Sequence, residues 1–159
     1  MSNSHNDVVF YFVNIPSSAA AEAVNRELLN LHVCNDWDGE PLTVESGDDF
    51  VDGYARNLAS DRLAALHALA VEHGFRFAVQ FDYSMELEGG PIAGLVVWFD
   101  GPAGKLGEYP SEACSFRPVF SLTDALVIVG SGAKNAPELL AATGKPIPTF
   151  MAQKVWSGS

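Results

Sequence analysis

The stretch that decides the fold is residues 75–88, which read FRFAVQFDYSMELE and alternate between apolar and polar side chains. Successive side chains of a β-strand point to opposite faces, so the pattern predicts one long strand with a buried face and a solvent-facing one. Gly89-Gly90-Pro91 and a second apolar run, 92–99, follow directly. We therefore expect 75–88 to pair with 92–100 in an antiparallel hairpin, which favours an antiparallel fold over a parallel nucleotide-binding sheet.

Three further segments upstream indicate a sheet with helices packed on it. Residues 8–13, VVFYFV, are apolar on both faces, which is typical of a central strand covered on both sides. A helix is predicted after Ser17 or Ser18, whose hydroxyl can cap it, with apolar residues on one face through Leu31. A second helix is predicted from Ser60 to Gly74, a residue that readily takes the left-handed conformation at a helix end.

The last third of the chain is less regular. Ser121 and Asp124 have the spacing of a capping box, which favours a helix, whereas the β-branched run 125–129 favours a strand, and we expect the strand. A short helix is expected over 136–142, and residues 147–156 are expected to close the sheet. Together these segments predict a single α+β domain over residues 1–159. It would be a two-layer sandwich in which a mostly antiparallel sheet of five or six strands packs with two or three helices.

The charge of the chain limits its partners. The 159 residues carry a formal net charge of −11, with 16 acidic and 4 basic side chains in residues 1–100 but 4 acidic and 5 basic in 101–159. Such a surface repels phosphate, so neither direct nucleic-acid binding nor attachment to an anionic membrane is expected. A basic protein partner would be attracted and steered.

Features of a secreted or metal-binding protein are not predicted. Cys34 and Cys114 are too few and too far apart for a disulfide framework or a zinc site. The first seven residues lack the basic start of a signal peptide, and the apolar run after them is too short to span a bilayer. We expect a cytoplasmic protein without a cofactor.

An acidic, aromatic-containing loop is the main candidate for partner binding. Between residues 34 and 57 there are seven carboxylates and no basic residue before Arg56. Aromatic side chains among charges are typical of protein interfaces, although a merely solvated loop is the simpler alternative. A calcium loop is not predicted, because the ligand spacing is not met. The predicted partner-binding residues are Asp36, Trp37, Asp38, Glu40, Asp48, Asp49, Phe50 and Asp52.

Two other places are weaker candidates for a ligand pocket. The first is the glycine-rich segment around Gly130, Ser131, Gly132 and Lys134, where a helix start could hold an anion, although neither the Walker nor the dinucleotide spacing is satisfied. The second is His67, between Leu63 and Val71 on the apolar side of the second predicted helix, where a structural role is the simpler interpretation.

The function expected from these features is binding rather than catalysis, since no motif identifies a catalytic residue. We expect a non-enzymatic cytoplasmic inhibitor or binding protein whose acidic surface engages a basic protein. In charge and size it is analogous to toxin-neutralising immunity proteins and to acidic phage or plasmid inhibitors of nucleic-acid enzymes. The alternative is a small enzyme or ligand-binding domain with a pocket near Gly130–Asn135 or near His67.

Overall fold

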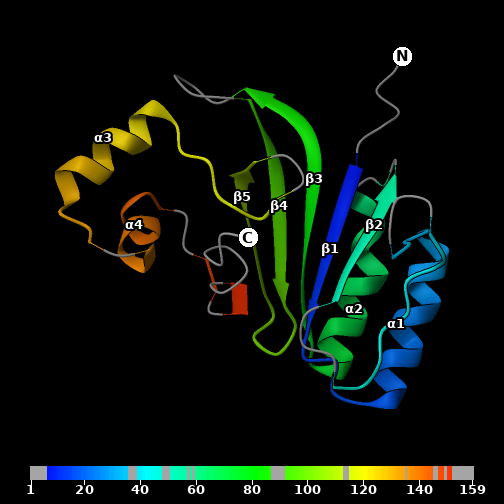
Figure 1. Ribbon diagram of the computed structural model, residues 1–159. Coiled ribbons are helices and arrows are strands. Elements are labelled where there is room, and N and C mark those ends of the chain that lie inside the picture. The colour runs from blue at the N-terminus through cyan, green and yellow to red at the C-terminus, as the bar shows by residue number, and fades with distance from the viewer. Residues whose placement is uncertain are drawn as a thin grey trace.

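The structure of the chain is a computed structural model, drawn as a ribbon in Figure 1. The structure describes most of the chain, and its remaining residues are left out of the description. The described residues are 7–35, 39–47, 51–56, 58, 60–86, 92–112, 115–134, 136–144, 147–148 and 150–151.

A five-stranded antiparallel sheet in the order β2-β1-β3-β4-β5 forms the centre of the structure. Its strands are β1 (Asp7–Val13), β2 (Val51–Arg56), β3 (Arg76–Glu86), β4 (Ile92–Asp100) and β5 (Lys105–Ser111). The sheet and the helices on it confirm the predicted α+β class with an antiparallel sheet. The predicted central strand is also confirmed, because β1 lies between β2 and β3 and its side chains are buried on both faces.

The predicted hairpin is present as β3 and β4. Arg76 pairs with Asp100 and Phe81 with Leu95, in antiparallel register. The register then shifts between Phe81 and Met85, so β3 holds extra residues opposite β4. A bulge of this kind bends a strand and increases its twist. The predicted turn, Gly89-Gly90, lies outside the described residues.

Two helices cover one face of the sheet (Figure 1). In α1 (Ser18–Asn30) the Ser17 hydroxyl accepts a hydrogen bond from the Ala20 amide at 3.1 Å, which confirms the predicted cap. A 3-10 turn, Ser60–Leu63, leads into α2 (Ala64–His73), which ends at Gly74 with a φ of 79° as predicted. The aromatic side chains that β3 turns to this face pack against both helices.

At Ala78 and Gln80, where the structure describes the side chains, the opposite face of β3 is buried, and there the prediction that it faces solvent is wrong. Ala78 and Gln80 are fully buried there, under Tyr109 of β5 and the later residues Phe116 and Met151. The buried Gln80 amide nitrogen donates to the Phe81 carbonyl at 3.1 Å, within reach also of Ser111 and Glu112. The cover comes from parts of the chain 30 to 70 positions away, so local alternation could not reveal it.

Two strands were not predicted, because each contains residues that normally interrupt strands. β2 contains Gly53, and a side chain there would meet those of Leu42 and Val33, which cross over it. β5 contains Gly107 and Pro110. Residues 42–44 and 116–120 form no strand. Leu42 only donates to the Val33 carbonyl at 2.9 Å, and Pro118 forms an isolated bridge with Ser111.

Residues 122–131 form a helix, α3 (Leu122–Ser131), so the expected strand at 125–129 is wrong. The capping box decides the conformation: the Asp124 amide donates to the Ser121 hydroxyl and the Ser121 amide to the Asp124 carboxylate, each at 3.1 Å. Without a sheet edge to pair with, the β-branched side chains gain nothing from an extended backbone. α4 (Ala136–Ala142) follows as expected.

The expected closing strand is not seen over the part of 147–156 that the structure describes. Residues 147–148 are irregular and 150–151 are helical, and the buried Met151 packs on the sheet face instead of extending its edge. Among the described residues, no helix combines the length and the apolar character that crossing a bilayer requires.

Candidate functional site

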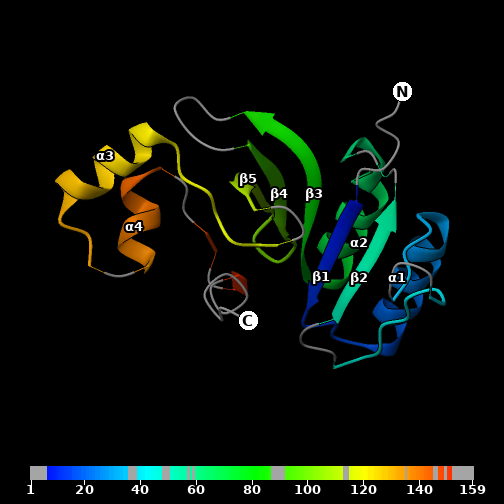
Figure 2. The ribbon, with the colours of Figure 1, turned by 45° about the horizontal axis from the view of Figure 1, so that its top comes forward.

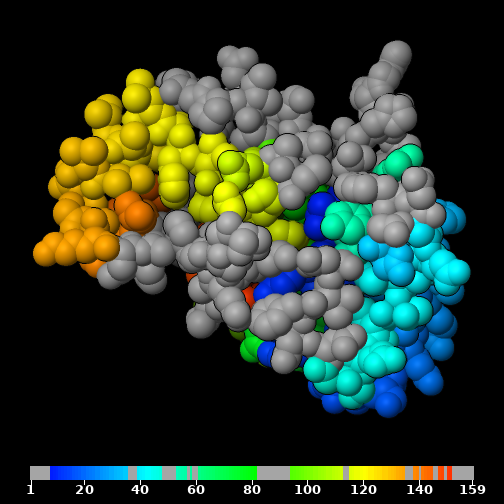
Figure 3. Space-filling view, viewed as in Figure 1, coloured from blue at the N-terminus to red at the C-terminus, as the bar shows by residue number. Residues whose placement is uncertain are grey.

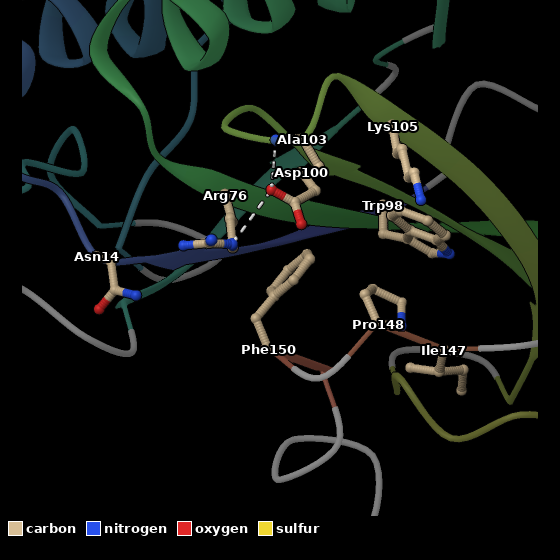
Figure 4. A pocket seen from close by; sticks show the side chains of 9 residues that line it. All are labelled: Asn14, Arg76, Trp98, Asp100, Ala103, Lys105, Ile147, Pro148 and Phe150. Atoms are coloured by element: carbon tan, nitrogen blue, oxygen red, sulfur yellow. Dashed lines mark hydrogen bonds and ion pairs between the residues drawn. The ribbon is translucent and has the colours of Figure 1, made fainter. Parts of the chain in front are cut away.

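An open groove of about 590 Å³ lies at one end of the sheet, on the face opposite α1 and α2 (Figure 4). Volumes of about 300–1,000 Å³ are usual for small-molecule sites. β3, β4 and β5 supply one side of the groove, and the segment before Met151 supplies the other. The lining residues are Asn14, Arg76, Trp98, Asp100, Ala103, Lys105, Ile147, Pro148 and Phe150.

The polar side of the groove follows from the strand register. Arg76 and Asp100 are cross-strand partners, and Asp100 also pairs with Lys105 across the turn into β5. The Asp100 carboxylate oxygen Oδ1 lies 3.2 Å from Nε of Arg76 and accepts from the Ala103 amide at 3.3 Å. One carboxylate therefore fixes both the turn and the guanidinium. Both side chains remain partly exposed, so the pair is worth at most about 1 kcal/mol of stability.

The apolar side of the groove is built around Trp98. Its cross-strand partner is Gly107, and a side chain at Gly107 would meet the indole ring, so glycine lets the ring lie close to the β5 backbone. Phe150 and Pro148 face Trp98 across the groove (Figure 4). This groove could not be predicted from the sequence, because its lining residues are separated by up to 136 positions, from Asn14 to Phe150.

The acidic loop is only partly described. Asp36, Trp37 and Asp38 lie outside the described residues, and so do the three predicted binding residues Asp48, Asp49 and Phe50. Glu40 is exposed. Asp52 belongs to β2, where its backbone pairs with that of Tyr11 in β1. Cys34, just before the first acidic segment, exchanges backbone hydrogen bonds of 2.7 and 2.8 Å with Tyr54 of β2. The second segment leads directly into Val51. Cys34 and Val51, described residues near the two segments, therefore both lie at the edge strand β2.

The glycine-rich segment lies between two helices, at the end of α3 and directly before α4. Gly130 and Ser131 are the last residues of α3, and Gly132, with a φ of 71°, ends it. The Ser131 hydroxyl donates to the Ile128 carbonyl at 2.9 Å, and Lys134 is exposed beyond the helix. A helix end presents carbonyl groups and partial negative charge, which disfavours an anion. The expected helix, α4, does follow the segment, but the two glycines belong to the end of α3, and the anion site stays a prediction.

His67 is part of an aromatic cluster between α2 and the sheet. Its ring stacks on Phe99 with centroids 4.6 Å apart, and the Phe77 ring lies at 5.5 Å. Its Nε2 is buried without a hydrogen-bond partner among the described residues, and burial lowers the pKa of the imidazole. Val71, expected on the same side, is 57% exposed and points away from the core. The arrangement supports the structural role predicted for His67.

We expect His67 to make folding stability depend on pH. Its pKa is lower in the folded than in the unfolded chain, so below about 6.5 the unfolded chain binds more protons. The stability that the neutral His67 imidazole contributes is complete above its pKa in the unfolded chain. This stability is lost as the pH falls toward its pKa in the folded chain. Urea melts from pH 7.5 downward should show that the free energy of unfolding falls less with pH for His67→Gln than for the wild type. Equal losses would contradict this role.

Comparisons of this chain with protein-family models, with curated proteins and with solved structures give no match. Within the described part of the chain, no group of three or more His, Cys, Asp or Glu side chains is arranged to hold a metal ion. The features of the described residues that bear on function are therefore the groove, the charge distribution and the exposed apolar surface.

Proposed function

We propose that this chain is a non-enzymatic binding protein whose acidic half engages a basic surface of a protein partner. The observation that carries the proposal is the spatial separation of charge. Residues 1–75 hold 12 acidic and 3 basic side chains, and their strands and helices, β1, α1, β2 and α2, lie together on one side of the molecule (Figures 1 and 2). α3 and α4, from the nearly neutral remainder, lie on the other side.

A separated charge of this kind favours association with an oppositely charged surface. The long-range field orients an approaching basic protein before contact and raises the rate of association. Exposed acids on the described part of this half include Glu22 of α1, Glu40 in the loop and Asp61 before α2. The predicted loop residues Asp36, Trp37, Asp38, Asp48, Asp49 and Phe50 would add charge and two aromatic anchors beside β2.

An exposed apolar row on α3 also supports a binding role. Leu122, Leu126 and Val129 recur at helical spacing and are 60%, 68% and 82% exposed. Figure 3 shows α3, in yellow and orange, at the left edge of the molecule. Contiguous apolar side chains in water are typical of surfaces that contact other proteins. This row lies far from the acidic half, so it would be a separate contact.

The proposal predicts a partner whose association slows strongly with salt. With a partner captured by the immobilised chain, surface plasmon resonance should show the association rate falling at least about tenfold between about 0.01 and 1 M salt. Asp36→Asn with Asp38→Asn should lower the association rate, and Trp37→Ala should raise the dissociation rate. The matched control is Glu108→Gln with Glu138→Gln, which removes the same charge from the other half. Binding indifferent to salt and to the loop variants would refute the proposal.

A further inference from the structure

The groove combines positive charge with aromatic surfaces in an otherwise acidic protein. Arg76 and Lys105 line it together with one carboxylate, Asp100. That carboxylate contacts Arg76 through Nε, at 3.2 Å. Within the described residues, the two terminal Nη nitrogens of Arg76 and the Lys105 ammonium have no hydrogen-bond or ion-pair partner. The groove therefore presents two cationic groups that are available to a ligand.

The orientation of Arg76 is restricted before any ligand arrives. Asp100 is itself held by the Ala103 amide, at 3.3 Å, and by its place at the end of β4. An arginine fixed through Nε still has its terminal pair of N–H groups, which match the two oxygens of a carboxylate in a planar, bidentate contact. A site that is ordered in advance loses less entropy when it binds.

The aromatic side of the groove can hold a flat ring. The Trp98 indole lies close to the β5 backbone at Gly107, and Phe150 projects from the facing segment toward Asp100 and Arg76 (Figure 4). Aromatic rings pair with one another in offset-stacked or edge-to-face arrangements, beyond the gain from burial alone. Pro148 and Ile147 add apolar surface on the same side.

We propose that this groove is a binding site for a small planar aromatic carboxylate. The ring would lie between Trp98 and Phe150, and the carboxylate would contact the terminal nitrogens of Arg76, with Lys105 adding attraction. A neutral aromatic molecule would not use the two cationic groups, and an inorganic anion would not use the apolar side. A cationic ligand would be repelled by Arg76 and Lys105. The volume of about 590 Å³ suits one such molecule. This inference is independent of the acidic half.

The test compares ligands that differ only in charge. Isothermal titration calorimetry would measure naphthalene-2-carboxylate, naphthalene-2-carboxamide and 2-naphthyl phosphate against the full chain. We expect the carboxylate to bind at least about tenfold more tightly than the carboxamide, in line with charge-assisted hydrogen bonds. We also expect it to bind more tightly than the phosphate, because a doubly charged phosphate costs more to remove from water and is repelled more strongly by the Asp100 carboxylate.

Four variants locate the site. Arg76→Gln should remove the preference for carboxylate over carboxamide, and Lys105→Gln, at an exposed position where folding is not at risk, should reduce it several-fold. Trp98→Leu should weaken both ligands alike, because both use the ring. Lys134→Gln, an equal change of charge at an exposed position outside the groove, should leave both affinities unchanged.

Several results would overturn the proposal. Equal binding of the carboxylate and the carboxamide would show that the cations do not select the ligand, and tighter binding of the phosphate would reject the carboxylate assignment. An absence of heat with all three probes, or an unchanged preference in Lys105→Gln and in a folded Arg76→Gln protein, would reject the site itself.

Discussion

Phe77→Ala is expected to lower the free energy of unfolding by about 3–5 kcal/mol, the usual cost of removing a buried phenylalanine ring. Phe77 is 1% exposed and lies where β3 meets both helices. The Phe12, Phe75 and Phe99 rings surround it at centroid distances of 6.0, 6.2 and 6.0 Å, and the His67 ring lies at 5.5 Å. The four surrounding rings, which belong to β1, β4, α2 and the residue before β3, cannot all move into the space that alanine would leave.

Urea-induced unfolding followed by circular dichroism measures this cost. The control is Leu126→Ala, which shortens an apolar side chain that is already in water and should change stability by no more than about 0.5 kcal/mol. A loss near zero for Phe77→Ala would mean that this face of β3 is not part of the core.

The features that could be predicted from the sequence are those determined by neighbouring residues. Alternation along 75–81 places the phenylalanines of β3 on the helix side of the sheet, and the double-sided apolar run 8–13 places β1 in the interior of the sheet, between β2 and β3. Ser17 and Gly74 mark helix ends, because capping depends on residues only a few positions apart. In each case the local preference and the tertiary contacts agree.

The features that could not be predicted depend on contacts between distant residues. Gly53 weakens the strand signal of β2, but it is required there because Leu42 crosses above it. Ala78 and Gln80 on the polar face of β3 are buried because Tyr109, Phe116 and Met151, about 30 to 70 positions later, pack on that face. The groove has the same origin, since β3, β4 and the segment before Met151 each contribute only part of it. No single stretch of sequence contains its pattern.

The predicted partner-binding residues remain predictions. Most of them lie in two segments outside the described residues, and they are predicted from the charge of these segments and from the aromatic residues beside the carboxylates. The glycine-rich candidate shows how a site hypothesis depends on secondary structure. Gly130 is expected to follow a strand and precede a helix, and in the structure it lies near the end of one helix, α3, and ahead of another, α4.

Gly101→Ala is expected to destabilise the fold by about 1–3 kcal/mol or more, because it overpacks a rigid contact. Gly101 is buried where β4 ends, and its amide donates to the Phe75 carbonyl at 3.1 Å. A methyl group there would overlap the Ala70 carbonyl group and the Phe75 oxygen. These are backbone atoms at the end of α2 and the start of β3, so no side-chain rotation can relieve the overlap, and the turn would have to move away from the helix.

Glycine to alanine at Gly130 should raise the stability of the fold instead of lowering it, and this variant is the matched control. Gly130 lies within α3, its φ is not positive, and a methyl group there would meet nothing within 4 Å. Alanine should stabilise the helix by about 0.5–1 kcal/mol, because glycine loses more backbone entropy when it becomes helical. Urea melts of both variants, with helix content followed at 222 nm, measure the pair. A stable Gly101→Ala protein would show that the turn and α2 are not in close contact, whereas a destabilised Gly130→Ala protein would argue against the helical assignment of 122–131.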